Sequence, residues 1–528
     1  MTRHGAGPEE LVVPRPQSIA FEGRRIPFEP ARVHITLEPG LEGAKRWLEA
    51  ELEMLVVGDS HPHESTDLVV ELAIGPAPAG VVAATGVDPA ARPEDERHIV
   101  EIADGRVRIV GPTPRAVLRG VATLLQLLNA PDRMLPIVRI EDGPRYAWRG
   151  LSLDAVRHPF TVEEIDRVVD LLARYKLNVL HLHLTDAQGW RLASTPHPLL
   201  ETVAGGPVIT AEDLQALTAR AAALGVTIVP EVDLPGHAAA AVRAYPALAA
   251  NETTARLGYL DPAVEGVEDF IRAEVAEFAE GTDAEFLHIG GDEPFGMPEA
   301  AYREAIRIAV GAAHQAGKRV VAWQEAVRAG ALDEHDLVQF WIGAENEIDV
   351  DAKKAELPPE AHRFVDAMVE LFAKAPDDLP LAAAAGIPVL ISSNDVLYLD
   401  RKYAEPAATV EGEKRRRRLG FPDYPAKTLR EMHEWTPQAL VEGRGVSVAG
   451  VEAAIWAESI ESFDDLAFLL LPRLGSAAER AWQHDATRWD DYSGRIAAHR
   501  PVWQRLGWGA AFSPGTAEPG TARNEQER

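Results

Sequence analysis

The feature that most constrains this chain is a regular alternation of short apolar runs and amphipathic segments, which begins near Trp148. The apolar runs are nearly continuous, as expected for parallel strands covered on both faces. We predict strands at 150–154, 178–184, 227–232, 286–289, 319–323, 338–341, 388–392 and 450–456, and helices at 162–175, 211–224, 267–280 and 300–316. Eight strands in this order predict a (β/α)8 TIM barrel. The alternative is a doubly wound open sheet, but no Gly-rich phosphate turn follows any strand.

The sequence before the barrel predicts a small α+β domain. Strand-like runs occur at 33–37, 67–74, 98–102 and 106–111, and a helical pattern follows at 115–128. This order predicts an antiparallel sheet with one helix packed on it. We therefore divide the chain into a disordered N-terminus (1–10), an α+β domain (11–143), a barrel (144–511) and a disordered tail (512–528).

Composition excludes several classes of protein. Asp and Glu number 82 against 53 Lys and Arg, so the net charge is −29, which argues against a nucleic-acid partner. The absence of cysteine excludes disulfides, zinc ribbons and thiol nucleophiles. No run has the length of a membrane span or the pattern of a secretory signal. We therefore expect no membrane partner and a cytoplasmic location by default, which leaves export open, and the sequence carries no sign of oligomeric state.

Polar or aromatic residues follow nearly every predicted strand. In a barrel these positions all lie at the C-terminal face, where barrel enzymes carry their active sites. Structural needs alone do not explain the same placement after so many strands. In chain order the residues are Asp154, Arg157, His183, Asp186, Asp233, His237, Asp292, Glu293, Trp323, Trp341, Tyr398, Asp400, Trp456 and Glu458.

The segment His288-Ile289-Gly290-Gly291-Asp292-Glu293 is the most informative of these. Two glycines between a strand and two acids permit an unusual turn that brings both carboxylates to one pocket. Adjacent carboxylates repel, which raises one pKa and suits that group to act as an acid near neutral pH. The alternative is that the two acids cap the next helix, where acids are also favoured.

The histidines allow more than one interpretation. His237 follows a turn at 233–236, where it could relay protons, position a carboxylate or be a satisfied structural residue. His181 and His183 alternate along one strand, and with His237 they could be metal ligands. No close-spaced ligand motif supports that alternative, so we expect neither a metal nor another cofactor.

Three tryptophans, Trp323, Trp341 and Trp456, each end a predicted strand. Indoles beside polar groups suit a sugar ring or an acetamide methyl. Ordinary core packing is the alternative, but three tryptophans at matching positions favour a pocket.

Together these motifs resemble the family 20 glycoside hydrolases, the β-N-acetylhexosaminidases. The resemblance runs in order over roughly residues 11–510, and the preceding α+β unit resembles the N-terminal domain of that family. The matching motifs are Trp148-Arg149-Gly150 through Asp154 to Arg157-His158, Lys176-Leu177-Asn178 through His183 to Asp186, Gln188-Gly189-Trp190-Arg191, Pro230-Glu231-Val232-Asp233 to His237, His288 to Glu293, Trp323-Gln324-Glu325, Tyr398-Leu399-Asp400, Glu452 through Trp456 to Glu458, and Pro472-Arg473 with Glu479-Arg480 and Trp482.

The resemblance implies an exo-acting enzyme that releases terminal β-linked GlcNAc or GalNAc with retention, using the substrate acetamido oxygen as nucleophile. It implies that Glu293 is the acid and base and that Asp186 and His237 support it. Asp292 and Tyr398 would contact the acetamido group, and Trp323, Trp341 and Trp456 would enclose that group and the ring. Arg157, Asp400 and Glu458 would bind the ring hydroxyls.

Two departures from the family pattern stand out. Many relatives carry a second Asp after Asp186, where this chain has Ala187, and the stretches 344–385 and 401–435 could reshape the leaving-group side of the cleft. Within the second stretch, the run 415–418 is expected to be a solvated surface run. Two other functions stay open at this stage: an inactive sugar-binding barrel, and a metal-dependent hydrolase that uses His181, His183 and His237.

Overall fold

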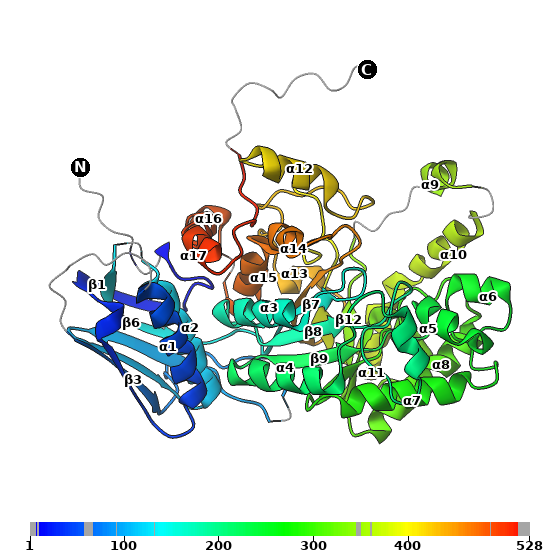
Figure 1. Ribbon diagram of the computed structural model, residues 1–528, viewed down its shortest axis with the longest axis horizontal. Coiled ribbons are helices and arrows are strands. Elements are labelled where there is room, and N and C mark those ends of the chain that lie inside the picture. The colour runs from blue at the N-terminus through cyan, green and yellow to red at the C-terminus, as the bar shows by residue number, and fades with distance from the viewer. Residues whose placement is uncertain are drawn as a thin grey trace, which may run out of the picture.

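The computed structural model describes residues 7, 10–56, 67–90, 92–130, 132–344, 350–358, 362–485 and 487–515. Parallel strands close into a barrel in the order β10-β11-β12-β13-β14-β7-β8-β9 (Figure 1). The strands are β7 Trp148–Asp154, β8 Val179–His183, β9 Thr227–Glu231, β10 Phe286–His288, β11 Arg319–Trp323, β12 Leu337–Phe340, β13 Val389–Ile391 and β14 Val448–Ile455. The predicted TIM barrel is confirmed, and each predicted strand is found within two residues of its expected ends.

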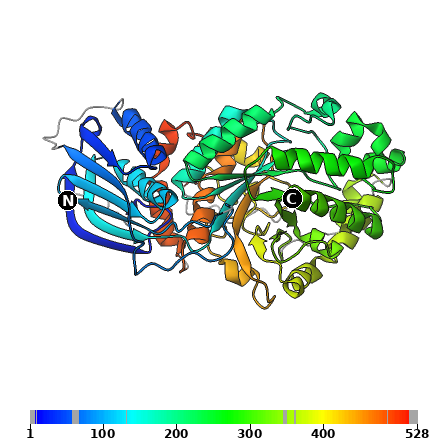
Figure 2. The same cartoon turned by 90° about the horizontal axis from the view of Figure 1, so that it is seen from below.

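Helices cover the outside of the barrel (Figures 1 and 2). The α-helices are α3 Val162–Arg174, α4 Ala211–Ala223, α5 Ala239–Ala244, α6 Glu252–Leu257, α7 Val267–Glu280, α8 Glu299–Gln315, α9 Val350–Glu356, α10 His362–Phe372, α11 Asp378–Ala385, α12 Val410–Arg418, α13 Pro437–Leu440, α14 Phe463–Leu470, α15 Arg473–Trp482, α16 Trp489–Ala497 and α17 Arg500–Arg505. Short 3₁₀ helices occupy Pro30–Arg32, Pro198–Val203, Pro246–Leu248, Gln324–Ala329 and Ala375–Asp377.

Local sequence sets where the early barrel helices begin. The Thr161 side chain accepts a hydrogen bond from the Glu164 N–H, and the Glu164 side chain accepts one from the Thr161 N–H, which forms a capping box for α3. Thr210 and Asp213 repeat the arrangement at α4. The βα segments that precede these helices are therefore held at defined exit points above the barrel.

The N-terminal domain is an α+β unit, as predicted, but its sheet is mixed. Its strands are β1 Ser18–Pro27, β2 Val33–Leu37, β3 Leu68–Ile74, β4 His98–Ala103, β5 Arg106–Gly111 and β6 Met134–Asp142, in the order β1-β6-β4-β5-β3-β2. The prediction of an antiparallel sheet with one helix is wrong in two details. The pairs β2–β3 and β3–β5 are parallel, and helix α1 Glu42–Val56 supplies the crossover between β2 and β3. The predicted helix is α2 Pro114–Leu128, which follows β5, so α1 is a second helix that the prediction lacked.

Both helices lie on the face of the sheet that turns toward the barrel (Figure 2), where α2 packs on β4, β5 and α3. A buried ion-pair group reinforces this junction. The Glu96 carboxylate accepts hydrogen bonds from Arg149 at the start of the barrel and from Arg119 of α2, the latter at 3.1 Å. Arg119 also donates to the Gly225 carbonyl of the barrel at 2.6 Å. The two domains thus share a desolvated electrostatic contact.

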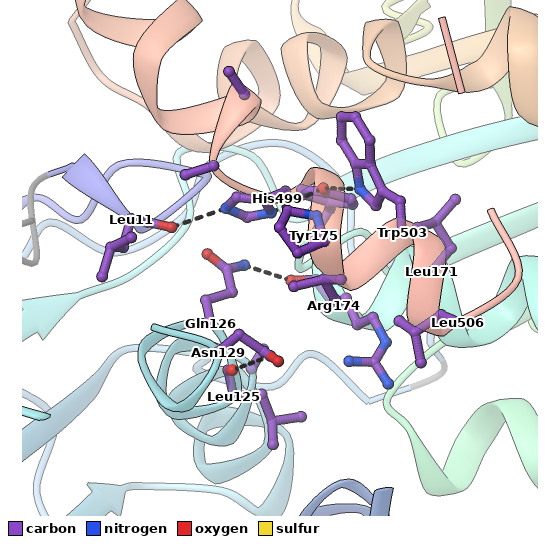
Figure 3. Close-up of a pocket in the computed structure, with 15 residues that line it drawn as sticks. Leu11, Leu125, Gln126, Asn129, Leu171, Arg174, Tyr175, His499, Trp503 and Leu506 are labelled. Carbon is purple, nitrogen blue, oxygen red and sulfur yellow. Dashed lines mark hydrogen bonds between the residues drawn. The ribbon is translucent and has the colours of Figure 1, made fainter. Parts of the chain in front are cut away.

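A mostly apolar cavity of about 280 Å³ lies at the same junction, between α2, α3 and α17 (Figure 3). At one end His499 bonds the Leu11 carbonyl at 2.8 Å and the Tyr175 hydroxyl at 3.0 Å, and Trp503 donates to that hydroxyl at 2.9 Å. The C-terminal helices are therefore tied to the barrel and to the first residues of the α+β domain.

The predicted disordered tail begins too early. Phe512 is fully buried and stacks on Tyr403 with ring centroids 3.8 Å apart, and Pro514 forms a β-bridge with Ala407. An aromatic side chain can bury its whole surface here, so residues 512–515 belong to the barrel domain. The rest of the predicted tail, and all of the predicted N-terminal segment except Gly7 and Glu10, lie outside the described residues.

Across the described ranges, no helix has the length and apolar character needed to cross a membrane.

The junction predicts a pH-dependent loss of stability in Glu96→Gln. Burial alone would raise the pKa of Glu96, but Arg119, Arg149 and Arg115 outweigh it and lower the pKa from 4.5 to about 2. The stabilisation is therefore present above pH 4.5 and is lost as the pH falls to about 2. We expect the substitution to lower the free energy of unfolding by about 3 kcal/mol at pH 7 and by progressively less toward pH 2.

Thermal and urea unfolding at several pH values measure this difference. Glu101→Gln is the matched control, because Glu101 pairs with Arg139 on the exposed face of the sheet and surface pairs contribute little. A deficit that stays constant from pH 7 to pH 3, or that also appears in Glu101→Gln, would contradict the assignment.

Candidate active site

The residues predicted from the strand ends meet at the C-terminal face of the barrel. Close contacts or direct charge interactions join each of them to at least one other. They are Arg157, Asp186, His237, Asp292, Glu293, Trp323, Trp341, Tyr398, Asp400, Trp456 and Glu458.

The turn after β10 has the unusual geometry that its glycines suggested. Gly290 and Gly291 have φ angles of 71° and 102°, and Glu293 itself has a φ of 48°. A Cβ on Gly290 would overlap the Asp233 carboxylate and lie 2.6 Å from the Asp233 Cα. This backbone conformation places the Asp292 and Glu293 carboxylates beside His237. Helix α8 begins only at Glu299 after Pro298, so the two acids do not cap it and the capping alternative is wrong.

His237 lies between the two acids and Asp186. Its Nε2 is 3.7 Å from an Asp292 oxygen and 3.6 Å from a Glu293 oxygen, while its Nδ1 is 3.2 Å from Asp186. Burial lowers the pKa of His237, but the carboxylates of Asp186, Asp233 and Asp292 outweigh it and raise the pKa well above 6.5. The imidazole is therefore a cation near neutral pH and faces both acids.

Asp292 is the less exposed of the acid pair, with 12% of its side chain accessible against 26% for Glu293. Burial raises the pKa of Asp292 to about 6; the His237 cation opposes the rise and the Glu293 carboxylate adds to it. One acid thus faces the interior with a perturbed pKa, while its neighbour is more open to solvent.

Asp186 connects this acid pair to the Arg157 guanidinium. Its carboxylate contacts Arg157 and accepts hydrogen bonds from His183 at 2.9 Å and from the Ala187 N–H. Arg157, with Asp154 3.2 Å away, lies over the Trp456 ring at 5.4 Å. Ala187, at the position where many relatives carry a second Asp, therefore supports Asp186 through its backbone.

Beneath the site, Glu231 is a hydrogen-bond hub whose role the sequence did not reveal. Its two oxygens accept from Trp323 Nε1 at 2.9 Å, from His181 at 3.1 Å and from His183, and one of them lies 2.9 Å from His288 Nδ1. An acid inside an otherwise apolar strand was the available signal. Glu231 holds one wall of the aromatic pocket and, through His183, the Asp186 carboxylate.

The aromatic side chains form a box. Trp341 and Tyr398 are parallel, with centroids 6.2 Å apart and 5° between their planes, and Trp456 lies edge-on to Tyr398 at 5.8 Å. Trp323 closes a further side, 5.9 Å from Trp456. The Trp341 indole donates at 3.1 Å to Glu325, a buried acid whose role the sequence did not indicate. The three tryptophans thus wall one pocket.

The far end of the site carries two acids. Asp400 is 2% exposed, and neither of its carboxylate oxygens has a hydrogen-bond partner among the described residues. Burial and the neighbouring Glu458 raise the pKa of Asp400 to about 8. A hollow of about 270 Å³ adjoins them and reaches Arg418. The predicted surface run at 415–418 is ion-paired at the end of α12, and only its last arginine borders this hollow.

The two long stretches lie against the site. In the first stretch, Phe364 and Phe372 of α10 contact Phe295, with ring centroids 4.8 and 6.3 Å apart, and Phe295 follows the acid pair. Phe372 also contacts Trp341. In the second, Tyr424 lies edge-on to Tyr398 at 6.0 Å. Residues 345–349 and 359–361 of the first stretch lie outside the described residues. Tyr424 and Phe295 are site neighbours that sequence reasoning missed, since neither stretch has a recognisable period.

The proposed metal ligands are not brought together. Both ring nitrogens of His181 bond carboxylates, Glu452 at 2.9 Å and Glu231 at 3.1 Å. Both ring nitrogens of His183 also bond carboxylates, those of Glu231 and Asp186. His237 shares Asp186 with His183 as a hydrogen-bond partner. A ligand needs an open lone pair directed at the ion, which His181 and His183 do not offer. The metal-dependent alternative built on these three histidines therefore fails on geometry.

Comparison with known proteins decides the family. Residues 146–485 match the model of the glycosyl hydrolase family 20 catalytic domain, and residues 10–143 match domain 2 of that family. The chain belongs to glycosyl hydrolase family 20. It is 37% identical over 447 residues to a β-N-acetylhexosaminidase of Cellulomonas fimi, covering 81% of this chain and 82% of that protein.

Solved structures of family 20 enzymes superpose over nearly the whole chain. The β-N-acetylhexosaminidase of Streptomyces coelicolor A3(2) has a TM-score of 0.76 at 26% identity, covering 98% of this chain and 100% of that one. A mutant β-hexosaminidase of Streptomyces plicatus in complex with the product GlcNAc has a TM-score of 0.77 at 26% identity, covering 98% of each. The protein is therefore a glycoside hydrolase of the β-N-acetylhexosaminidase type that acts on carbohydrate.

The turn after β10 predicts that Gly290→Ala inactivates the family 20 enzyme. The added methyl must push Asp233 or the acid pair away, and misplacement by about 1 Å costs on the order of 100-fold in rate. Turnover of an aryl N-acetyl-β-glucosaminide and the melting temperature measure the effect. Gly311→Ala in α8 is the control, because nothing lies within 4 Å of its added methyl. Wild-type turnover by Gly290→Ala would contradict this account of the turn.

Proposed function

We propose that this enzyme is an exo-acting β-N-acetylhexosaminidase that releases terminal, non-reducing β-linked GlcNAc or GalNAc with retention, by substrate-assisted catalysis through an oxazolinium intermediate. The observation that carries the proposal is the aromatic box beside Asp292. The box is an apolar enclosure of three indoles and the Tyr398 ring, and the Asp292 carboxylate lies beside that phenol. A site of this form favours a substrate that carries an N-acetyl group.

Glu293 is the proposed general acid and base. It is the more exposed acid of the pair, which suits contact with a leaving group and with water, and it lies 3.6 Å from His237. It would protonate the glycosidic oxygen as that bond breaks and then remove a proton from the attacking water. Phe295 and helix α10 border this side and would contact the leaving group.

Asp292 and Tyr398 are proposed to act on the acetamido group. Asp292 would accept the N–H and stabilise the positive charge that develops as the acetamido oxygen attacks the anomeric carbon. Tyr398 would donate its hydroxyl to that oxygen and so direct it. Burial raises the pKa of Tyr398 well above 10, so the phenol keeps the proton that it donates. Trp323, Trp341 and Trp456 would enclose the methyl group and the ring.

The proposed exo mode rests on the charged side chains at the far end of the site. Arg157 would bind the O3 and O4 hydroxyls, and Asp400 and Glu458 would bind O4 and O6. The unpartnered carboxylate of Asp400 offers acceptors that hydroxyl groups can satisfy, because buried polar groups need partners. Asp186 and His237 would hold Glu293 and Asp292 in position through the contacts described above.

The charge of Asp292 predicts an acidic limb in the rate profile. Its pKa is about 6, and the proposed role needs the ionised form, which dominates above that pH. We expect kcat/KM to fall about tenfold per pH unit below about pH 6. Asp292→Asn should lower kcat/KM by roughly 100-fold or more and remove this limb, because the amide does not titrate there. An unchanged limb in Asp292→Asn would contradict the assignment.

Glu293→Gln tests the acid directly. With a poor leaving group that needs protonation, such as a chito-oligosaccharide, we expect a loss of about 100-fold or more, and a smaller loss with nitrophenyl glycosides. The control is Glu299→Gln, an exposed acid at the start of α8. Equal losses on both substrates would contradict the role of Glu293.

Stereochemistry and inhibition test the rest of the proposal. Proton NMR of the first product should show the β-anomer, and an oxazoline-mimicking thiazoline should inhibit competitively. Appearance of the α-anomer first would rule out retention. Absence of turnover on any N-acetylated aryl glycoside, with thiazoline still bound, would favour the inactive sugar-binding alternative.

A further inference from the structure

The His237 Nε2 nitrogen faces one carboxylate oxygen of Asp292 and one of Glu293, and it forms no hydrogen bond with either. His237 Nε2 is 3.7 Å from an Asp292 oxygen and 3.6 Å from a Glu293 oxygen, and Nε2 has no hydrogen-bond partner among the described residues. Asp292 is 8% exposed, and its second oxygen is also unpartnered. Ligand atoms of Asp233, His237 and Asp292 lie within 4.8 Å of one another. One imidazole and two carboxylates therefore offer ligand atoms close enough together to bind one ion.

The spacing fits a four-coordinate ion of the zinc type. Bonds of about 2.0–2.1 Å in a tetrahedron separate ligand atoms by about 3.3 Å. The 3.7 Å between His237 Nε2 and the Asp292 oxygen is close to this spacing, and a ligand atom of Asp233 lies within 4.8 Å of ligand atoms of both residues. Cis ligands of an octahedral magnesium ion are about 3 Å apart, and calcium needs six to eight oxygens. An imidazole donor likewise favours zinc or copper over magnesium or calcium.

Asp186 supplies the support that metal-binding histidines require. Its carboxylate accepts from His237 Nδ1 at 3.2 Å, which leaves Nε2 as the coordinating atom and fixes the ring. The neighbouring histidines differ, because every ring nitrogen of His181 and His183 already bonds a carboxylate. Of these three rings, His237 alone keeps a nitrogen without a hydrogen bond on the side of the acid pair.

We propose that Asp233, His237 and Asp292 form a binding site for a divalent d-block cation such as Zn²⁺, and that this cation inhibits the enzyme in competition with substrate. Coordination through Nε2 replaces the proton on that nitrogen, which leaves to solvent. The bound cation neutralises Asp292, whose negative charge the proposed mechanism uses to stabilise the oxazolinium. The loss of turnover rests on the function proposed above, whereas cation binding itself does not.

Cobalt spectroscopy tests binding without turnover. Titration of the full-length protein with Co²⁺ should give the intense visible bands of a four-coordinate ion, and His237→Gln should weaken this binding at least about 10-fold. His314→Asn is the matched control, because His314, Asp333 and Asp336 form a separate surface group with ligand spacing. Absence of the bands, their persistence in His237→Gln, or their loss in His314→Asn would overturn the proposal.

Two measurements on the wild-type enzyme guard against misfolding of the variant. The thiazoline inhibitor should displace Co²⁺ and remove the bands. Zn²⁺ should raise the apparent KM for an aryl N-acetyl-β-glucosaminide while leaving kcat unchanged, and a chelator should reverse this. Retention of Co²⁺ in the presence of thiazoline, or activation by Zn²⁺, would overturn the proposal. If no N-acetylated glycoside is hydrolysed, the proposed function fails, and the cobalt titration of His237→Gln still decides the cation site.

Discussion

The buried carboxylate of Glu231 is the interaction on which the rest of the site depends. Barrel interiors are usually filled by layers of apolar side chains, but here one layer is built from Glu231, Glu452 and three histidines. Glu231 accepts from His181, His183 and Trp323 and lies 2.9 Å from His288 Nδ1, and Glu452 accepts from His181 and Trp148. Ionised groups are tolerated at this depth because nearly every one has an opposite charge or a donor beside it.

This polar layer fixes the positions of side chains in the pocket above it. Trp323 and Asp186 are held, directly or through His183, by the same carboxylate. The aromatic enclosure and the charged side of the site are therefore fixed relative to each other by the core of the barrel. Preorganisation of this kind lowers the cost of orienting a reacting group at the moment of reaction.

Much of this architecture could be predicted because its signals are local. Each barrel strand is a short apolar run with a polar residue at its end, and a capping box marks the start of α3. The Gly290-Gly291 pair likewise predicted the turn after β10. The aromatic box could be expected because its three tryptophans occupy equivalent positions after β11, β12 and β14.

The parts that escaped prediction depend on long-range contacts. Strand β1 is largely exposed and β6 contains Pro136, so neither has a clear alternating pattern. The parallel pairing of β2 with β3 depends on the crossover through α1, and that of β3 with β5 depends on β4 lying on the far side of β5, which no single segment encodes. The burial of Phe512 depends on Tyr403, more than a hundred positions away, and the hub role of Glu231 depends on histidines from two other strands.

Helix α10 has a consequence for how this enzyme can diversify. Phe364 and Phe372 contact Phe295 just beyond the acid pair, whereas the charged end at Asp400 is built by segments elsewhere in the chain. In the proposed binding mode, the leaving group and the far end of the sugar ring therefore meet separate parts of the protein. Substitution of Phe364 can then alter which aglycone is accepted, whereas substitution of Phe372 also affects the pocket through its contact with Trp341.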